Sequence, residues 1–298
     1  MPTERWGGTT WTVVDQGEMV PSMRLNPPFY EDEFMEVERE LTRLEARPLG
    51  RFIPDELPDG SKGITYGQVG ARVLSPRGSV RYLQVINIRE TGIDFAIKPD
   101  RVAENSHNDP PRSRVRPQDI LLTNTAFRGT QTLMGRCVVV HRDFGKLNIS
   151  QDIDRIRVVG INPYFVCVFL KSSFGKLQIE RVVHGVDSTK INFGRIRSLL
   201  IPDVPESVQR HIEWEYLDMA NCHDRAMQIK ERILAEQAVD PGRFGETINA
   251  LAENDREYKR NLAEAKNRLR HLIQQVEKII EGSKRPIKPF RVPRIAVP

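Results

Sequence analysis

Apolar residues follow two different patterns along the chain. Between about residues 48 and 204 they occur in short runs rich in Val, Ile, Phe and Tyr, which Gly, Pro, Asn and Asp separate. This texture predicts many strands joined by long loops. The runs expected as strands are "RYLQVINI", "DILLTNTAF", "GRCVVVHR", "DRIRVV" and "QIERVV". The run "NPYFVCVFLKSS" fits a strand or a short buried helix equally well.

Helical spacing appears first on the amino-terminal side of this region. Phe34, Val37, Leu41 and Leu44 recur at intervals of three and four within the acidic segment 31–46. This spacing predicts a short amphipathic helix.

A longer helical pattern follows Pro202 and Pro205. Apolar positions alternate by four and three in two series, which only Glu215 and Asp255 interrupt. Heptad seams of this kind predict two coiled-coil helices, each of roughly 30–35 residues or about 50 Å. The expected seam includes Val208, Ile212, Met219, Ile229, Ile233, Leu262, Leu269, Leu272 and Val276.

The two helices have an alternative placement, packed on a globular core. Whether they pair within one chain or between two chains also stays open. We expect an α+β protein with a mostly-β domain followed by a long two-helix coiled-coil arm. The expected boundaries are an amino-terminal segment 1–46, a domain 47–204, the arm 205–282 and a tail 283–298.

Charge is unevenly distributed among these segments. Residues 47–204 carry 24 Lys and Arg against 15 Asp and Glu, and the tail carries five basic residues and no acidic one. Residues 1–46 are acidic, with 4 basic against 10 acidic groups. The middle domain and the tail therefore favour a polyanionic partner such as nucleic acid. The alternative is that solvated loops and faces carry this excess of charge.

Few motifs for chemistry are present. Cys137, Cys167 and Cys222 are isolated, and the six histidines lack metal-ligand spacing, so no disulfide framework, metal site or cofactor is expected. The stretch "NPPFY" at 26–30 is similar to a motif of adenine methyltransferases, but no Gly-rich segment for a methyl donor precedes it. We expect a protein without catalytic activity of its own. The absence of a long apolar run predicts no membrane span and a cytoplasmic location.

One segment has a family resemblance. The stretch "GVDSTKINFGRIRSLLIPDVPESVQRHI" resembles the end of a target recognition domain in the specificity (S) subunits of type I restriction-modification systems. That end has Gly, Ser/Thr, a basic residue, an apolar residue and Asn, then Ile-Pro, a second proline and Gln-x-x-Ile. Val208 departs from the acidic residue usual in the family. The matching positions are Gly185, Thr189, Lys190, Ile191, Asn192, Ile201, Pro202, Pro205, Gln209 and Ile212.

Earlier segments resemble the family in the same order, so that the likeness covers roughly residues 24–237. They are "RLNPPFYEDEF", "RPLGRFIPDELPDGSKGITYG", "RYLQVINIRETGID", "RPQDILLTNTAFRGTQTLMGRCVVV" and "NISQDIDRI".

The resemblance implies a DNA-reading subunit that performs no chemistry. Each recognition domain in the family reads one half of a split DNA sequence, and the helices dock the methyltransferase and restriction subunits. One recognition domain implies a half subunit that pairs through its helices with itself or with a relative. The implied partners are double-stranded DNA, a DNA adenine methyltransferase subunit, a restriction subunit and a second copy. The alternatives are the split specificity part of a fused, type IIG-like methyltransferase and a coiled-coil adaptor that binds no DNA.

Candidate DNA contacts follow from residue type and from loop position. In "TNTAFRGTQT", Asn124, Arg128 and Gln131 are expected to read bases, because Arg, Asn and Gln match base edges. For each candidate the alternative is a solvated loop or turn bonding. Arg112, Arg114 and Arg116 are expected to contact phosphates, and Tyr66, Gln68, Lys190 and Asn192 are further candidates.

Overall fold

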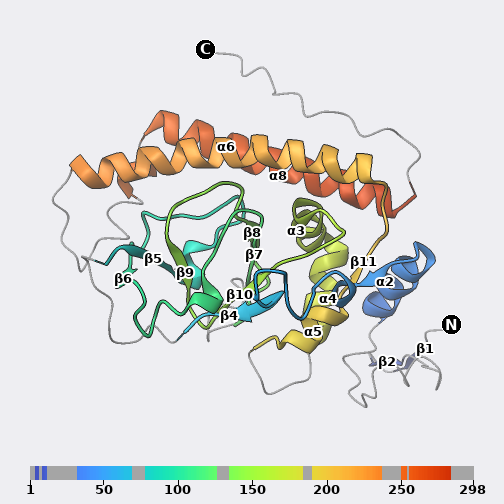
Figure 1. The fold of residues 1–298 in the computed structure, drawn as a ribbon. Coiled ribbons are helices and arrows are strands. Elements are labelled where there is room, and N and C mark those ends of the chain that lie inside the picture. Colours follow the sequence, from blue (N-terminus) through green and yellow to red (C-terminus); the bar gives the residue numbers. More distant parts are fainter. Residues whose placement is uncertain are drawn as a thin grey trace, which may run out of the picture.

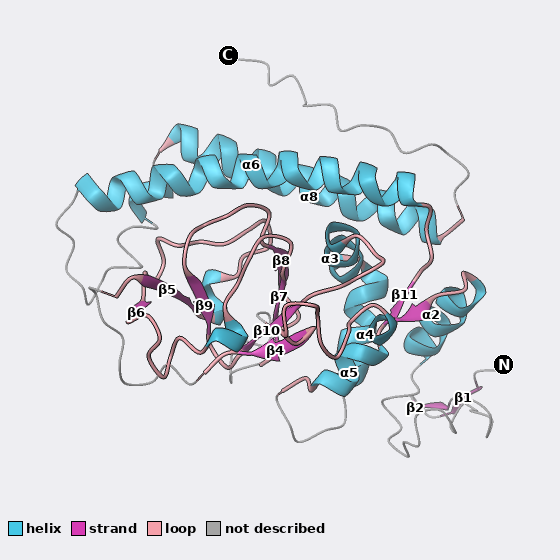
Figure 2. Ribbon diagram, viewed as in Figure 1, coloured by secondary structure: helices cyan, strands magenta, loops and turns pink. Residues whose placement is uncertain are grey.

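A computed structural model describes residues 4–6, 9–11, 32–68, 78–125, 134–183, 190–236, 250–253 and 255–282. Figures 1 and 2 show its helices, strands and loops. In chain order the elements are β1 (Glu4–Trp6), β2 (Thr9–Trp11), α2 (Asp32–Arg43), β3 (Arg47–Pro48), η2 (Leu49–Arg51), β4 (Ile64–Tyr66), β5 (Val80–Leu83), η3 (Val85–Asn87), β6 (Arg101–Val102), η4 (Pro111–Ser113), β7 (Ile120–Thr123), β8 (Cys137–Val139), β9 (Leu147–Ile149), β10 (Ile153–Ile156), α3 (Pro163–Lys171), α4 (Ser173–Val183), α5 (Phe193–Ser198), β11 (Leu200–Ile201), α6 (Glu206–Glu236) and α8 (Arg256–Ile280).

Short strands form the centre of the molecule. An antiparallel sheet has the order β4-β10-β7-β8, and a smaller sheet has the order β6-β5-β9 with β5 and β9 parallel. Strands β3 and β11 pair antiparallel, so the first and last residues expected for the domain 47–204 lie beside each other. The expected α+β fold class, with a β-rich domain and long helices, is confirmed.

The two long helices lie side by side across one side of the sheets, as Figure 1 shows. They are antiparallel, because Arg225 and Arg268 contact Asn261 and Asp218 respectively, each at 3.2 Å. The pairing is therefore within one chain.

Their apolar faces are part of the core of the domain. Ile212 and Met219 of α6 are fully buried, in one cluster with Leu272 of α8, Phe165 of α3 and Ile120 of β7. The other seam residues are buried or half-buried in this cluster or in a smaller one between the helices: Val208, Ile229, Ile233, Leu262, Leu269 and Val276. All nine face inward, so the helices complete the domain and do not project from it as an arm.

Polar contacts also attach α6 to the sheets. The hydroxyl oxygen of Tyr216 accepts a hydrogen bond from the backbone N–H of Val139 at 2.9 Å. The ammonium of Lys230 lies 2.8 Å from the carboxylate of Asp94, and both side chains are almost completely buried. A charged pair in this position is stable only while both partners are present.

Two short apolar runs form helices where strands were possible. Residues 163–171 are the buried helix α3, which Asn162 caps by accepting hydrogen bonds from the N–H groups of Tyr164 and Phe165. The expectation of a strand at "QIERVV" was wrong, because these residues belong to α4. Ile179 and Val182 are three apart and are both buried, which places them on one helical face.

Candidate nucleic-acid interface

Three arginines share one exposed surface. Along residues 112–116, Arg112 and Arg116 are exposed and the side chain of Arg114 is 40% exposed, whereas Ser113 and Val115 are buried. Arg112 and Ser113 belong to the 3₁₀ turn η4, and Arg114, which follows the turn, takes an extended conformation. Consecutive side chains of an extended chain point to opposite sides, so Arg114 and Arg116 point outward while Val115 points inward. Arg112 is exposed on the turn itself.

Buried polar groups hold the backbone of this segment from within. The guanidinium of Arg155 donates to the carbonyl of Arg112 at 3.1 Å, and that of Arg157 donates to the carbonyl of Arg114 at 3.3 Å. The carboxylate of Asp119 accepts from the N–H of Arg116 at 2.9 Å. The segment is thus fixed in place without using the side chains of its own arginines.

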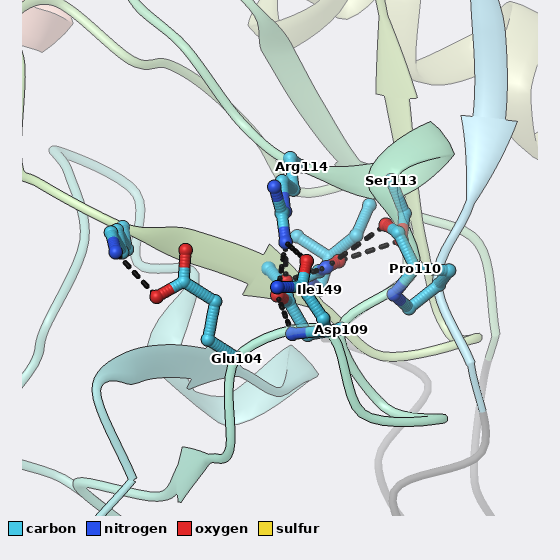
Figure 3. Close-up of polar contacts among 9 residues, drawn as sticks. Glu104, Asp109, Pro110, Ser113, Arg114 and Ile149 are labelled. Carbon is cyan, nitrogen blue, oxygen red and sulfur yellow. Dashed lines mark hydrogen bonds and ion pairs between the residues drawn. The ribbon is translucent and has the colours of Figure 1, made fainter.

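Arg114 belongs to a polar network that Figure 3 shows in detail. Its guanidinium contacts the fully buried carboxylate of Asp109 at 2.6 Å and the amide oxygen of Asn105 at 2.7 Å. Burial by itself would raise the pKa of Asp109, but hydrogen bonds from Arg114, Asn148 and Asn105 lower it on balance. Arg114 therefore both compensates a buried charge and presents part of its guanidinium to solvent.

Arg116 is less constrained. Its guanidinium pairs with Asp59, and both side chains are nearly half exposed. Hydrogen bonds from Ser61 and then from Arg116 keep the pKa of Asp59 below its usual range. Exposed ion pairs contribute little to stability, so Arg116 can exchange Asp59 for another anion at small cost.

Two further arginines lie beneath this surface, and neither was among the predicted DNA contacts. Arg157 makes a bidentate pair with Asp119, with contacts of 2.6 and 3.1 Å. Arg155 is fully buried, and burial lowers the pKa of its guanidinium to about 10. The signal was the alternation in "DRIRVV", where polar residues in a central strand must find partners inside.

The exposed surface continues from Arg112 to strand β4. Gln68 accepts a hydrogen bond from the guanidinium of Arg112 at 2.9 Å, and its amide nitrogen lies 2.7 Å from the ring of His107. Two residues before Gln68, Tyr66 is 44% exposed. The ammonium of Lys190 lies 5.0 Å from the centre of the Tyr66 ring. Six predicted contacts thus form one linked row, which we call the arginine row: Lys190, Tyr66, Gln68, Arg112, Arg114 and Arg116.

The turn at residues 150–152 connects three segments at one end of this row. Gln68 forms a β-bridge with Ser150, and the hydroxyl of Thr125 donates to Asp152 at 3.1 Å. The ammonium of Lys190 donates to the carbonyl of Gln151 at 2.9 Å. Residues 69–77, 126–133 and 184–189 lie outside the described residues, and with them the predicted base contacts Arg128 and Gln131.

Two predicted contacts have structural roles instead. Asn124 is fully buried, and its amide donates to the carboxylate of Asp154 at 2.7 Å. The structure therefore does not present the amide of Asn124 at the surface, where a base-reading residue was expected, because the carboxylate of Asp154 binds it beneath. The side chain of Asn192 is exposed, but its oxygen accepts from the N–H of Arg195 at 3.0 Å and so caps α5.

Asp154 has an unusual environment next to Asn124. Burial raises its pKa to about 7, although the hydrogen bond from Asn124 and the charge of Lys190 oppose the change. Within the described chain, its second carboxylate oxygen has no hydrogen-bond partner. Both features favour the protonated acid at this position.

The arginine row consists of four cationic side chains, one amide and one aromatic ring. The described residues contain no group of three or more His, Cys, Asp and Glu side chains that could bind a metal ion. None of the described helices is both long and apolar enough to cross a membrane. The chemistry of the row is that of binding an anion.

Comparisons with known proteins give distant matches. No model of a known protein family matches the chain, and neither does any curated protein. Among solved structures, the S subunit of a type I restriction-modification system from M. genitalium matches at 12% identity and a TM-score of 0.39, over 64% of this chain and 43% of that one. The HsdS subunit from Thermoanaerobacter tengcongensis matches at 14% identity and a TM-score of 0.36, over 85% of this chain and 55% of that one.

A third match comes from a study of complex assembly and conformational transition in the type I restriction-modification system. It has 14% identity and a TM-score of 0.37, over 80% of this chain and 53% of that one. The chain thus spans about half the length of the solved structures that it matches. At such identities the function has to be argued from this chain's own residues.

Proposed function

We propose that this chain is the DNA-recognition subunit of a type I restriction-modification system or of a related DNA methyltransferase complex. The observation that carries the proposal is the arginine row, in which three guanidiniums face solvent on a backbone fixed by Arg155, Arg157 and Asp119. Affinity for DNA comes largely from such groups at phosphates. The sequence resemblance to S subunits supports the same role independently.

In this proposal the contacts are divided among the predicted residues. Arg112, Arg114 and Arg116 contact phosphates, because their exposed guanidiniums follow one another along a single fixed segment. Tyr66, Gln68 and Lys190 contact the adjacent part of the duplex. Base reading falls to Arg128 and Gln131, which follow Thr123, the last residue of β7, by five and eight residues in the sequence.

The partners of the proposed subunit are an adenine methyltransferase subunit and, in a restriction complex, a nuclease subunit. A second copy of the chain supplies the other half of a split target. Because the seam residues of α6 and α8 are buried within one chain, two copies pair through the outer faces of these helices. The recognised DNA is then an inverted repeat, since a two-fold protein matches a two-fold site.

The test measures binding of full-length protein to duplex DNA, with and without the methyltransferase subunit of its own system. The guanidinium of Arg112 donates to the neutral amide of Gln68, so Arg112→Ala breaks no salt bridge that the structure describes. It should weaken binding to all duplexes alike. It should also reduce the slope of log affinity against log salt by about 0.9 for each lost phosphate contact. Arg43→Ala is the control, because Arg43 is an exposed arginine of α2, outside the arginine row, that pairs with Glu40 at 2.8 Å.

Two outcomes contradict the proposal. If Arg112→Ala and Arg43→Ala change the salt slope equally, the arginine row is not the contact surface. If neither the chain nor its complex binds DNA, the adaptor function replaces it. Sequencing of the methylated sites then tests the symmetry, and an asymmetric split motif would exclude two identical readers.

A further inference from the structure

A second basic surface lies on other elements of the fold. Residues 134–136 before β8, the end of α3, helix α4 and helix α8 enclose a cleft of about 520 Å³. Pockets that bind ligands usually have volumes of about 300–1,000 Å³, and the volume of this cleft lies within that range. None of the arginine-row residues lines it.

The floor of this cleft is apolar. Leu170 of α3, Ile179 of α4 and Leu269 of α8 are each at most 5% exposed. Met134 and Ile273 are half-buried beside them. An apolar surface of this kind gains free energy only when apolar atoms cover it.

The rim of the cleft is positively charged. Lys176 of α4 and both Lys266 and Arg270 of α8 are exposed, and Lys171 and Arg136 lie deeper. Burial and then the charge of Arg89 lower the pKa of Arg136. Only two carboxylates, those of Glu90 and Glu180, line the same cleft.

The exposed cations of the rim lack acidic partners. Within the described chain, no salt bridge joins Lys176, Lys266 or Arg270 to a carboxylate, and the ammonium of Lys171 donates to a backbone carbonyl, that of Glu90, at 2.7 Å. Within the described chain, the three exposed cations Lys176, Lys266 and Arg270 are therefore not held in salt bridges.

A larger cleft of about 1120 Å³, between α2 and the start of α6, differs in this respect. Its carboxylates Asp203 and Glu206 pair with Arg47 at 2.7 Å and Arg210 at 3.8 Å. A third, Glu213, accepts a hydrogen bond at 2.6 Å. These three carboxylates have partners, whereas in the basic cleft exposed cations without a salt bridge in the described chain lie beside an apolar floor.

We propose that the basic cleft is a docking site for an acidic segment of a partner protein that carries at least one large apolar side chain. The carboxylates of this segment pair with Lys176, Lys266 and Arg270. The apolar side chain of the segment covers Leu170, Ile179 and Leu269. Duplex DNA satisfies the rim but leaves the apolar floor uncovered. The site is separate from the arginine row, so it stands or falls independently of DNA recognition.

The experiment pans a display library of random 12-residue peptides against the full-length protein. Enriched peptides should share carboxylates that flank a large apolar residue. The double variant Lys266→Glu, Arg270→Glu should weaken their binding at least tenfold by fluorescence anisotropy. Lys259→Glu, at an exposed position elsewhere on α8, should change it less than twofold, and both variants should unfold at nearly the same temperature as the original protein.

Four outcomes overturn the assignment. An enriched pool without this signature, or peptides that bind the double variant equally well, would show that the cleft does not select such segments. Displacement of the peptides by a short DNA duplex would make the cleft part of the DNA surface. Enrichment of peptides that match residues 12–31 of this chain would assign the cleft to an internal segment instead. If the double variant fails to fold, Ile273→Gln in the half-buried part of the floor tests the same dependence.

Discussion

The residues of the arginine row were expected to face a partner because of their residue types and loop positions, and the pair α6–α8 was expected to form a coiled-coil arm because of its heptad spacing. In the row, burial alternates from residue to residue, and Arg112 and Arg116 remain outside. In the helices, the heptad positions Ile212, Met219 and Leu272 are almost fully buried inside the same chain. Spacing indicates which residues share a face, but the chemistry of that face determines what covers it.

The physical reason is the different cost of covering each face. An apolar seam gains free energy from any apolar surface, and the nearest is α3 and the sheets of the same chain. A guanidinium leaves water only when a carboxylate or carbonyl replaces its hydration. Arg157 has such partners, and one nitrogen of Arg155 has them while its other two are buried without one in the described chain. Within the described residues, the guanidinium of Arg112 bonds to the amide oxygen of Gln68 and stays exposed.

The largest expected effect comes from removing the helices. A chain that ends at residue 205 loses Ile212, Tyr216, Met219, Leu272 and Val276 from its core. Each buried apolar side chain contributes about 1.5–3 kcal/mol, so the loss approaches the whole stability of about 5–15 kcal/mol of a typical domain. The fragment should show no cooperative transition in urea when followed by circular dichroism. A cooperative transition would restore the interpretation of the helices as a separate arm.

The next effect concerns the buried pair between α6 and the domain. Lys230→Ala leaves the carboxylate of Asp94, which is 3% exposed, without its closest cation. The free energy of unfolding should fall by about 3–5 kcal/mol. Urea denaturation measures the change, and the double variant Lys230→Met, Asp94→Asn should recover most of it. Lys259→Ala, an exposed change on α8, should stay within about 0.5 kcal/mol.

The third prediction concerns the effect of pH on stability through Asp154 of β10. Its pKa is about 7 in the folded protein, against 3.8 as its ordinary value. Between these two pH values the folded state keeps a proton that the unfolded state loses, so this group lowers stability as the pH rises. Asp154→Asn should remove that loss and stabilise the protein at pH 8 by on the order of 3 kcal/mol, with little change at pH 4. Equal effects at the two pH values would mean that Asp154 is ionised in the folded protein.

The smallest effects separate two members of the arginine row. Arg114→Ala should destabilise the protein by about 1–3 kcal/mol, because it leaves Asp109 buried with fewer donors. Arg116→Ala should change stability by less than about 0.5 kcal/mol, because its pair with Asp59 is exposed. Thermal unfolding measures both, and DNA titration of Arg116→Ala should still show weaker binding. Equal destabilisation by the two variants would mean that Arg116 is also structural.

Local sequence determined much of the fold and part of the candidate site. The helix α2, the strand β7 and the two long helices follow from spacing that each segment contains by itself. Arg112, Arg114 and Arg116 could be named because three arginines at alternate positions on a Pro-rich segment have little chance of complete burial.

Only the tertiary structure decided which polar residues face solvent and what the helices contact. Asn124 lies one residue beyond a strand, as a base-reading residue could, but the carboxylate of Asp154, thirty residues away, binds its amide. The partners of Arg155, namely the carbonyls of Lys62 and Arg112, are likewise distant in sequence. A spacing pattern describes one segment, whereas burial depends on the surface that another segment brings against it. For that reason the seams of α6 and α8 could be located from the sequence, but their role in the core of the domain could not.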